Sequence, residues 1–401
     1  MESGSFKTIG GAAKDSYWLC RYLSEHLKDA EIEAYADFSR FGGGIKYAEN
    51  DPDPYAYDVV LLNSIRDAKI IDMKIRRDRN LPFCIYTDRA DVVNHYYKSP
   101  IKRVFSKGAN LPIFKDPSLY ERAINSAREK SSSRKISMLR DFLSKSYELN
   151  IFERMKGWLG CYIAISALQA NNAALFFKGS NVKVEYLLRA PHPEFKPAGT
   201  EKSFKGAVYA GRLEESQKNV SFMLRGVRKL LDIDPSLSSA ELLRISGDGP
   251  DRDMYVSMAK DLGISDNIKF LGFTDSDKLV HVYNNASFFV ITSNWEGLGR
   301  SIIEAMACGL PILLNEKINP PISFEPNSEL VENGKRGFVY KSGDLADFAS
   351  KFRELYSNQK LASTMGMAAF EFVRKNMSIE KLYSSYMQII ESGAKRVQRS
   401  R

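Results

Sequence analysis

Cysteine and histidine are scarce in this chain, and their spacing excludes several kinds of site. The 401 residues include only four cysteines and four histidines. The cysteines, Cys20, Cys84, Cys161 and Cys308, form no C-x-x-C pair, and the histidines have no ligand spacing, so no zinc site is predicted. We expect four reduced thiols, buried as small apolar groups in a reducing compartment.

Long apolar segments are also missing. No run of about eighteen apolar residues, the length needed to cross a bilayer, occurs in the chain. The nearest candidate, residues 158–168, is too short, and the N-terminal MESGSFKTIG lacks the apolar stretch of a secretory signal. These features predict a cytoplasmic protein.

Positive charge is in excess and is unevenly spread. The net charge is +9, and residues 101–150 hold eleven basic against five acidic residues. A basic face attracts phosphates, anionic lipid or nucleic acid, although a solvated surface with a modest bias explains the same numbers. One hypothesis is that the N-terminal domain docks on an anionic membrane, at its inner face. Nucleic acid is not an expected partner, because no series of stacking aromatics interleaves the basic residues.

Alternating strand and helix patterns run along the whole chain. A single core rarely grows beyond about 300 residues, so the length predicts two domains. The alternation indicates doubly wound parallel sheets of the α/β class. Strands are expected at 58–63, 81–87, 163–166, 206–211, 242–246, 268–271, 287–292 and 311–314, and helices at 15–27, 220–231, 254–262, 279–284, 301–308 and 379–391.

A stretch rich in proline and glycine at 190–205 has the composition of a linker. We therefore expect an N-terminal domain over 1–195, a second domain over 196–375, and a C-terminal helix with a frayed basic tail over 376–401. The helix is expected to pack back on the N-terminal domain. Almost nothing apolar precedes Gly10-Gly11, so we expect either that the true start lies upstream or that the first strand of the N-terminal domain is short or missing.

The sharpest local signal is the segment NWEGLGRSIIEAMACGLP in the second half. Glu296 lies just past a predicted strand, Gly297 and Gly299 bracket a turn, and a helix is expected from Ser301, with Glu304 in its first turn. Carboxyl ends of parallel strands are where ligands bind, and a helix N-terminus suits a diphosphate. A glutamate there can accept two hydroxyls of a sugar or ribose. Alternatively, Glu304 is an acid favoured near a helix start.

A second signal follows the strand predicted at 206–211. Gly211-Arg212-Leu213 is followed by Lys218, and two cations at a strand end can hold a diphosphate. The alternative is a pair of solvated loop charges. Gly10-Gly11, before the helix expected at 15–27, can bring backbone amides to a phosphate but is also a generic loop signal.

Taken together, GRL…K, GDGP, FLGF and EGLGRSIIEAMACGLP, over roughly residues 205–345, resemble the retaining glycosyltransferases of family 4 (group 1). The resemblance implies the GT-B fold, in which two doubly wound, Rossmann-like domains face each other across a cleft. It also implies transfer of a sugar from a nucleotide-diphosphate sugar to a glycan, lipid-linked or small-molecule acceptor, with retention at the anomeric carbon. No metal or other cofactor is implied.

The resemblance also implies residue roles. Arg212 and Lys218 would hold the diphosphate and stabilise it as leaving group, Glu296 would touch hydroxyls of the donor sugar, and Glu304 would bind the ribose. Phe270 and Leu271 would line the base pocket. The other expected donor contacts are Gly11, Gly247, Gly297, Leu298, Gly299, Arg300 and Ser301.

Two positions depart from the family pattern. A histidine is frequent after the strand corresponding to 81–87, and this chain has Asp88 and Arg89 there, which we assign to the acceptor side. Position 300 is arginine where an apolar residue is frequent, so Arg300 either reaches a charged donor or phosphate or points to solvent. His26 and His281 lie in predicted helices and are expected to be structural.

Two other functions remain open at this point: a nucleotide-sugar epimerase on the same fold, and a non-catalytic protein that kept the nucleotide pocket. The GRL…K and paired-glutamate motifs argue against both. Donor base, sugar, acceptor and oligomeric state cannot be read from the sequence.

Overall fold

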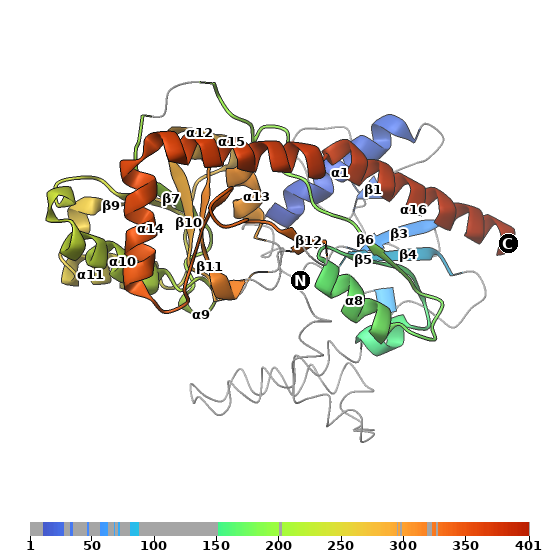
Figure 1. The fold of residues 1–401 in the computed structure, drawn as a ribbon. Coiled ribbons are helices and arrows are strands. Elements are labelled where there is room, and N and C mark those ends of the chain that lie inside the picture. Colours follow the sequence, from blue (N-terminus) through green and yellow to red (C-terminus); the bar gives the residue numbers. More distant parts are fainter. Residues whose placement is uncertain are drawn as a thin grey trace, which may run out of the picture. The chain divides into compact units, whose positions relative to one another are not determined.

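Two compact units make up the computed structural model (Figure 1): Met1–Leu187 together with Tyr383–Arg401, and Leu188–Leu382. The domain boundaries expected from the sequence stay a prediction. The structure describes residues 11–27, 33–34, 46–47, 57–62, 68, 71–72, 81–87, 151–199, 203–294, 296, 299–318, 323–325 and 328–400.

A six-stranded parallel sheet forms the centre of the second unit. Its strand order is β14-β11-β10-β7-β8-β9, and every neighbouring pair is parallel. The chain therefore builds outward from β7 in one direction and then from β10 in the other. The strands are β7 (Ala207–Ala210), β8 (Leu243–Ser246), β9 (Ile268–Gly272), β10 (Phe288–Ile291), β11 (Ile312–Asn315) and β14 (Gly337–Tyr340).

Helices cover both faces of this sheet, as its apolar strands require. Successive side chains of a strand point to opposite faces. In β10, Phe288 packs on Phe352 of α14, whereas the next residue, Phe289, packs on Tyr283 of α12. The helices are α9 (Glu215–Lys218), α10 (Val220–Ile233), α11 (Arg252–Asp261), α12 (Ser276–Asn285), α13 (Arg300–Ala307), α14 (Leu345–Ser357) and α15 (Gln359–Asn376).

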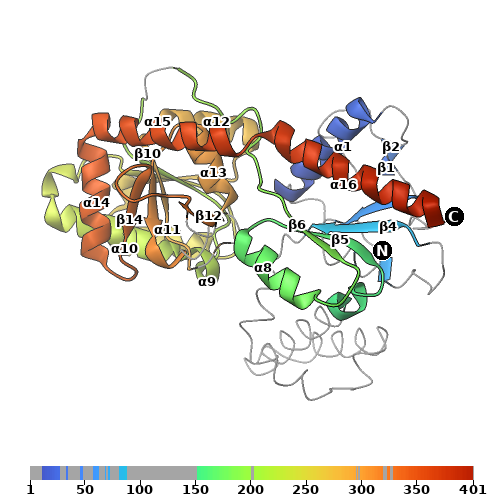
Figure 2. The same ribbon diagram turned by 45° about the vertical axis from the view of Figure 1, so that its right-hand side comes forward.

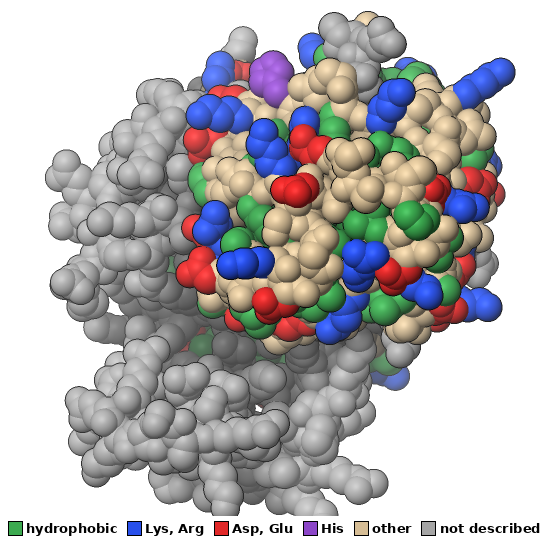
Figure 3. Space-filling model, turned by 90° about the vertical axis from the view of Figure 1, so that its left-hand side faces the viewer, with side chains coloured by type: hydrophobic (Ala, Val, Ile, Leu, Met, Phe, Trp, Pro, Cys, Tyr) green, Lys and Arg blue, Asp and Glu red, His purple; other side chains and the backbone are tan. Residues whose placement is uncertain are grey.

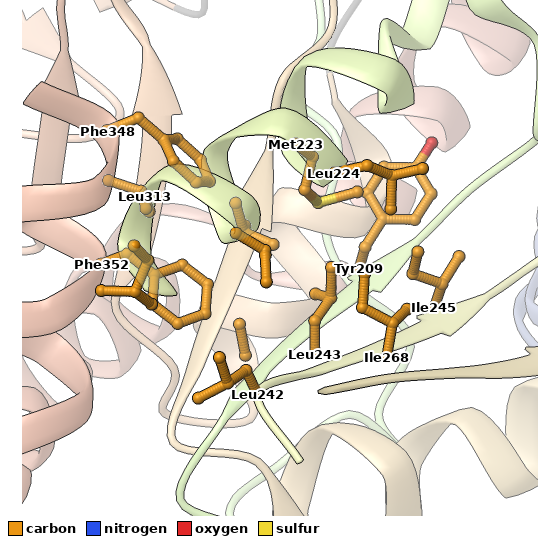
Figure 4. Packing of buried hydrophobic residues seen from close by; sticks show 14 of the residues in the cluster. Tyr209, Met223, Leu224, Leu242, Leu243, Ile245, Ile268, Leu313, Phe348 and Phe352 are labelled. Carbon is orange, nitrogen blue, oxygen red and sulfur yellow. The ribbon is translucent and has the colours of Figure 1, made fainter. Parts of the chain in front are cut away.

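The core on the α10 side is continuous from the sheet through two helices (Figure 4). Tyr209 and Leu243 contribute from the strands, Met223 from α10 and Phe348 from α14. Gly226 allows α10 to approach α14, because a Cβ there would lie 2.3 Å from the ring of Phe348. This packing fixes β7 and β8, and with them the loops that follow these strands.

The first unit contains a four-stranded parallel sheet of order β3-β4-β5-β6, with α8 (Ala167–Phe176) on one side (Figures 1 and 2). The described residues also include two-stranded pairs, β1 with β2 in this unit and β12 with β13 in the second. The bounds are β1 (Glu33–Ala34), β2 (Lys46–Tyr47), β3 (Val59–Leu62), β4 (Phe83–Thr87), β5 (Leu159–Ala164), β6 (Lys183–Tyr186), β12 (Ser323–Glu325) and β13 (Ser328–Glu329).

The C-terminal helix α16 (Ile379–Ser400) packs within the first unit, beside α1 (Gly11–His26) (Figure 2). The hydroxyl groups of Tyr386 and Thr87, the last residue of β4, lie 3.1 Å apart in a buried hydrogen bond. A Cβ on Gly393 would lie 2.1 Å from the ring of Phe83, so α16 contacts β4 directly there.

Several expected bounds are wrong. The tail of α16 is helical to Ser400 rather than frayed, because Val397 is buried and extends the apolar face of the helix. Helix α1 begins at Gly11 instead of Asp15, since Ala12 and Ala13 favour helix. Strand β5 begins at Leu159, four residues before the predicted strand at 163–166.

The four cysteines form no disulfide, as expected, and Cys84, Cys161 and Cys308 are buried, whereas Cys20 is only partly buried. Burial raises the pKa of Cys20 to about 11 and that of Cys84 to about 12, so both are thiols at neutral pH. None of the helices in the described part of the chain combines the length and the apolar character of a membrane span.

The loops after β7 and β8 cross at two glycines. Gly247 has a φ of 145°, and a Cβ on it would lie 1.9 Å from the carbonyl oxygen of Gly211. The amide of Gly211 donates to Ser246 O at 3.0 Å. Only glycine permits this close approach, which fixes where the chain leaves β7.

We predict that Gly247→Ala lowers the urea midpoint of unfolding far more than Gly263→Ala. Gly263 also has a positive φ, 66°, but nothing lies within 4 Å of its Cβ position. Gly263→Ala should therefore lower the free energy of unfolding only by the cost of a left-handed alanine, about 1–2 kcal/mol. Gly247→Ala adds a backbone clash, and we expect a loss of at least about 3 kcal/mol. Equal midpoints for the two variants would contradict the proposed crossing.

Candidate functional site

The strand order of the second unit reverses between the neighbouring strands β7 and β10. The connection after β7 and the connection after β10 therefore lead to opposite sides. In open α/β sheets ligands bind outside the carboxyl ends of the strands at such a switch point. The segment after β7 leads into α9 and Lys218, and the segment after β10 leads to Glu296. Both sequence signals therefore meet at one edge of the sheet.

Side chains after β10 hold the end of α9. The Thr292 hydroxyl lies 3.1 Å from Lys218 O and 3.0 Å from Asn219 O, to which it donates. Asn294 donates its backbone amide to Gln217 O at 2.8 Å. The backbone on both sides of Lys218 is thus fixed to the end of β10.

Glu215 anchors the start of α9. Its carboxylate accepts the Ser221 amide at 3.2 Å, the Tyr255 hydroxyl at 2.9 Å, and the Ser221 hydroxyl. Its own amide donates to the carboxylate of Asp251 at 2.8 Å. Because α9 is a single turn, these contacts and the left-handed Asn219, with φ 47°, set its direction.

Lys218 and Glu296 form an ion pair at the switch point. Lys218 Nζ lies 2.6 Å from Glu296 Oε1, and the Ser293 hydroxyl donates to the same oxygen at 2.6 Å. The side chains are only 13% and 7% exposed, so each charge depends on the other for compensation. Burial, with the Glu296 charge second, raises the pKa of Tyr209 well above its usual range.

Glu304 lies on α13, which follows Gly299 in the left-handed region, with φ 63° and ψ 57°. The helix begins at Arg300, so Glu304 is its fifth residue and lies outside the first turn, contrary to our expectation. The interpretation of Glu304 as a first-turn acid is therefore wrong. Glu304 is buried, and Arg300 Nε lies 3.2 Å from its Oε1.

Arg300 also contacts His192, which precedes β7. Arg300 Nη2 lies 3.3 Å from His192 Nε2. Nearby, the hydroxyl of Tyr283 is buried and has no hydrogen-bond partner among the residues that the structure describes. Its pKa is raised well above the usual range, first by burial and then by the charge of Glu304.

Arg212 is not part of the buried ion pair. Its side chain is 65% exposed, and its Nη1 lies 3.1 Å from Glu214 Oε2. The Tyr209 hydroxyl donates to its carbonyl oxygen at 3.3 Å, so the backbone is fixed while the guanidinium extends into solvent.

The remaining predicted residues are dispersed. Gly247 lies at the crossing with Gly211, and Phe270 packs partly against the core from β9, next to a half-buried Leu271. Ser301 is the second residue of α13. Gly297, Leu298, Asp88 and Arg89 lie outside the described residues, and for Gly11 only the helical backbone is described.

The sequence did not point to the residues that hold the predicted site residues in position. Thr292, Ser293 and Asn294 directly follow β10, and polar residues at that position are a signal that could have been used. No comparable local signal marks Glu215 or His192, because their partners are distant or lie on other elements. Within the described ranges, no group of three or more His, Cys, Asp or Glu is arranged to hold a metal ion, and metal independence stays a prediction.

Figure 3 shows the face of the second unit near α10, α11 and α14. Lys and Arg side chains are interspersed with Asp and Glu on this face, and neither sign dominates. This face is therefore no extended basic surface of the kind that binds nucleic acid.

We predict that Lys218→Met lowers the stability of the second unit by about 2–3 kcal/mol, because it leaves the buried Glu296 carboxylate without its counter-charge. The double variant Lys218→Met/Glu296→Gln should recover part of this loss. Urea unfolding of the wild type and both variants measures the effect. If the double variant is no more stable than Lys218→Met, the carboxylate does not depend on the lysine.

Comparison with known proteins finds a family match in the second half of the chain. Residues 193–372 match the family Glycosyl transferases group 1. D-inositol 3-phosphate glycosyltransferase of Corynebacterium jeikeium is 28% identical over 191 residues, which cover 46% of this chain and 44% of that protein. N-acetyl-alpha-D-glucosaminyl L-malate synthase of Bacillus anthracis is 29% identical over 150 residues, 37% of each chain. The chain thus spans less than half the length of these relatives.

The fold agrees over a longer range. The crystal structure of Anabaena Alr3699/HepE in complex with UDP covers 96% of this chain and 97% of that protein, with a TM-score of 0.63 and 14% sequence identity. Two parallel Rossmann-like sheets with surrounding helices, one in each unit, give the chain an α/β fold of the GT-B class. The match to the family Glycosyl transferases group 1 lies within the second unit.

Proposed function

We propose that the protein is a glycosyltransferase that moves a sugar from a nucleotide-diphosphate sugar to a glycan, lipid-linked or small-molecule acceptor. The observation that carries the proposal is the buried Lys218–Glu296 pair at the switch point between β7 and β10. A cation for the diphosphate and a carboxylate for sugar hydroxyls lie next to each other there. The matched family over 193–372 supports the reaction class.

In this proposal the cations stabilise the leaving diphosphate. An ammonium group has three N–H donors, so Lys218 keeps its contact with Glu296 and still donates to phosphate oxygens. Arg212, exposed on a fixed backbone, adds a guanidinium fork when the diphosphate is bound. Negative charge develops on the diphosphate as the glycosidic bond to it breaks, and prepositioned cations lower that barrier.

The two glutamates recognise hydroxyl groups. Both described contacts of Glu296 are made to Oε1, and we propose that Oε2 accepts a hydroxyl of the donor sugar. Glu304, one turn into α13, accepts a ribose hydroxyl. The residues from Gly297 to Ser301, together with Gly247, Phe270 and Leu271, complete the donor site in the proposal, and Gly11 approaches the phosphates.

The donor base and the stereochemistry are finer proposals. The Anabaena protein was crystallised with UDP, which supports a uridine nucleotide as the first candidate. Retention at the anomeric carbon, and the assignment to family 4, follow from the motif resemblance. We also propose that no metal is required, because Lys218 and Arg212 supply the positive charge that a metal would bring.

The acceptor side is proposed from the sequence alone. Asp88 and Arg89 would face the acceptor, directly after β4. The basic residues of 101–150 would bind the inner face of an anionic membrane, as expected of a cytoplasmic, peripheral enzyme that acts on a lipid-linked acceptor. Neither an epimerase nor a non-catalytic binding protein is favoured by a specific contact.

We predict that UDP, among UDP, GDP and ADP, raises the melting temperature, and that Glu304→Gln weakens binding of the same nucleotide about tenfold. The reason is the loss of a hydrogen bond to a charged group, worth about 1.5–3 kcal/mol. Glu354→Gln, at an exposed position of α14, is the control and should bind normally. Absence of a shift with all three nucleotides would contradict the proposed function.

We also predict that Lys218→Met reduces kcat for release of nucleoside diphosphate from the donor by about 10²–10³-fold, because a donor to the leaving group is lost. Lys360→Met, exposed on α15, should leave kcat unchanged.

Proton NMR of the product reports its anomeric configuration. A changed sugar formed without an acceptor would indicate an epimerase, and an inverted product would exclude retention.

A further inference from the structure

His192 lies in the segment that connects the two units, where the sequence predicts a linker, yet it is buried against the second unit. Two residues of α12 hold this segment. Asn284 accepts the Ala198 amide through Oδ1 at 2.9 Å and donates Nδ2 to Lys196 O at 3.0 Å. The Phe195 and Tyr283 rings pack with centroids 5.9 Å apart. The segment therefore has a defined path.

This path brings an imidazole to the arginine that contacts Glu304. Arg300 directs Nε to Glu304 Oε1 at 3.2 Å and Nη2 to His192 Nε2 at 3.3 Å. Arginine can only donate, so His192 Nε2 is the acceptor in this contact. Since Nε and Nη2 lie on the same edge of the planar guanidinium, the two contacts together fix the plane of that group.

An ion pair four residues apart on a helix does not by itself fix a side chain, because exposed pairs of this kind contribute only about 0.3–0.5 kcal/mol. Arg300 differs from such pairs in two respects. The Glu304 side chain is only 11% exposed, and His192 adds a third group from another part of the chain. The expectation that Arg300 reaches a donor or points to solvent misses both contacts.

We propose that Arg300 is a positioning residue for the nucleotide, which orients the Glu304 carboxylate for the ribose, and that His192 acts by orienting Arg300. The inference rests on the proposed function, because it assigns Glu304 to the nucleotide. Its consequence is that nucleotide affinity depends on a side chain of the connecting segment. An orienting role affects binding of the nucleotide and of the transition state equally, so KM changes and kcat does not.

A double-mutant cycle tests this order of action. We predict that Arg300→Met weakens UDP binding about tenfold, as expected when a hydrogen bond to a charged group is lost. His192→Leu should weaken it about threefold to fivefold, and the double variant should bind like Arg300→Met alone, because His192 has no effect once Arg300 is absent. His192→Gln, whose amide oxygen also accepts a hydrogen bond, should restore most of the affinity.

Isothermal titration with UDP and donor kinetics measure these effects, and the melting temperature confirms that each variant is folded. Arg228→Met is the control. It removes an arginine of α10 that is also paired with an acidic residue four positions further along the helix, and it should not change UDP affinity.

If His192→Leu weakens binding equally with and without Arg300, or if kcat falls while KM is unchanged, the inference is wrong. If His192→Leu binds UDP as the wild type does, the inference alone fails. If the wild type binds no nucleotide, the proposed function fails and the inference with it.

Discussion

The ion pair between Lys218 and Glu296 is the contact on which the arrangement at the carboxyl edge of the second unit's sheet depends. It joins two residues 78 positions apart in sequence. One follows β7 and the other follows β10, the two strands between which the strand order reverses. Two largely buried charges are tolerated only when they are paired and hydrogen-bonded. The hydrogen bonds of Thr292 and the carboxylate of Glu215 therefore have a common effect, which is to hold the short helix that brings the ammonium group to the carboxylate.

A second glutamate, Glu304, is also paired with a basic residue. The Glu304 carboxylate is paired with Arg300, as the Glu296 carboxylate is with Lys218, so both of these carboxylates have a cationic partner from the chain itself. In the proposed donor site, carboxylates held in this way keep their direction before the nucleotide sugar arrives, which reduces the reorganisation that binding requires. Arg212 differs from Lys218 and Arg300, because its guanidinium is largely exposed and is paired with the neighbouring Glu214.

Most of the fold could be predicted from the sequence, because buried parallel strands such as Ala207–Ala210 and Phe288–Ile291 are continuous apolar runs with helical patterns between them. The glutamates and Lys218 could be located because they follow such strands. Their partners could not, since His192 and Arg300 are 108 residues apart and no periodicity links them. The ends of elements were also missed, as at Gly11 and Ser400, where packing or local propensity extends a helix beyond its apolar pattern.

The course of α16 has a consequence for how the chain is made. The second unit is one continuous stretch, whereas the first is completed by residues 383–401. Phe83, near the beginning of β4, packs against Gly393 of this last segment. During synthesis, the ribosome therefore releases every residue of the second unit before the first unit receives the helix that covers β4. A nascent chain therefore holds that strand uncovered until residues 383–401 have been made, so the unit whose translation begins first is completed after the second unit.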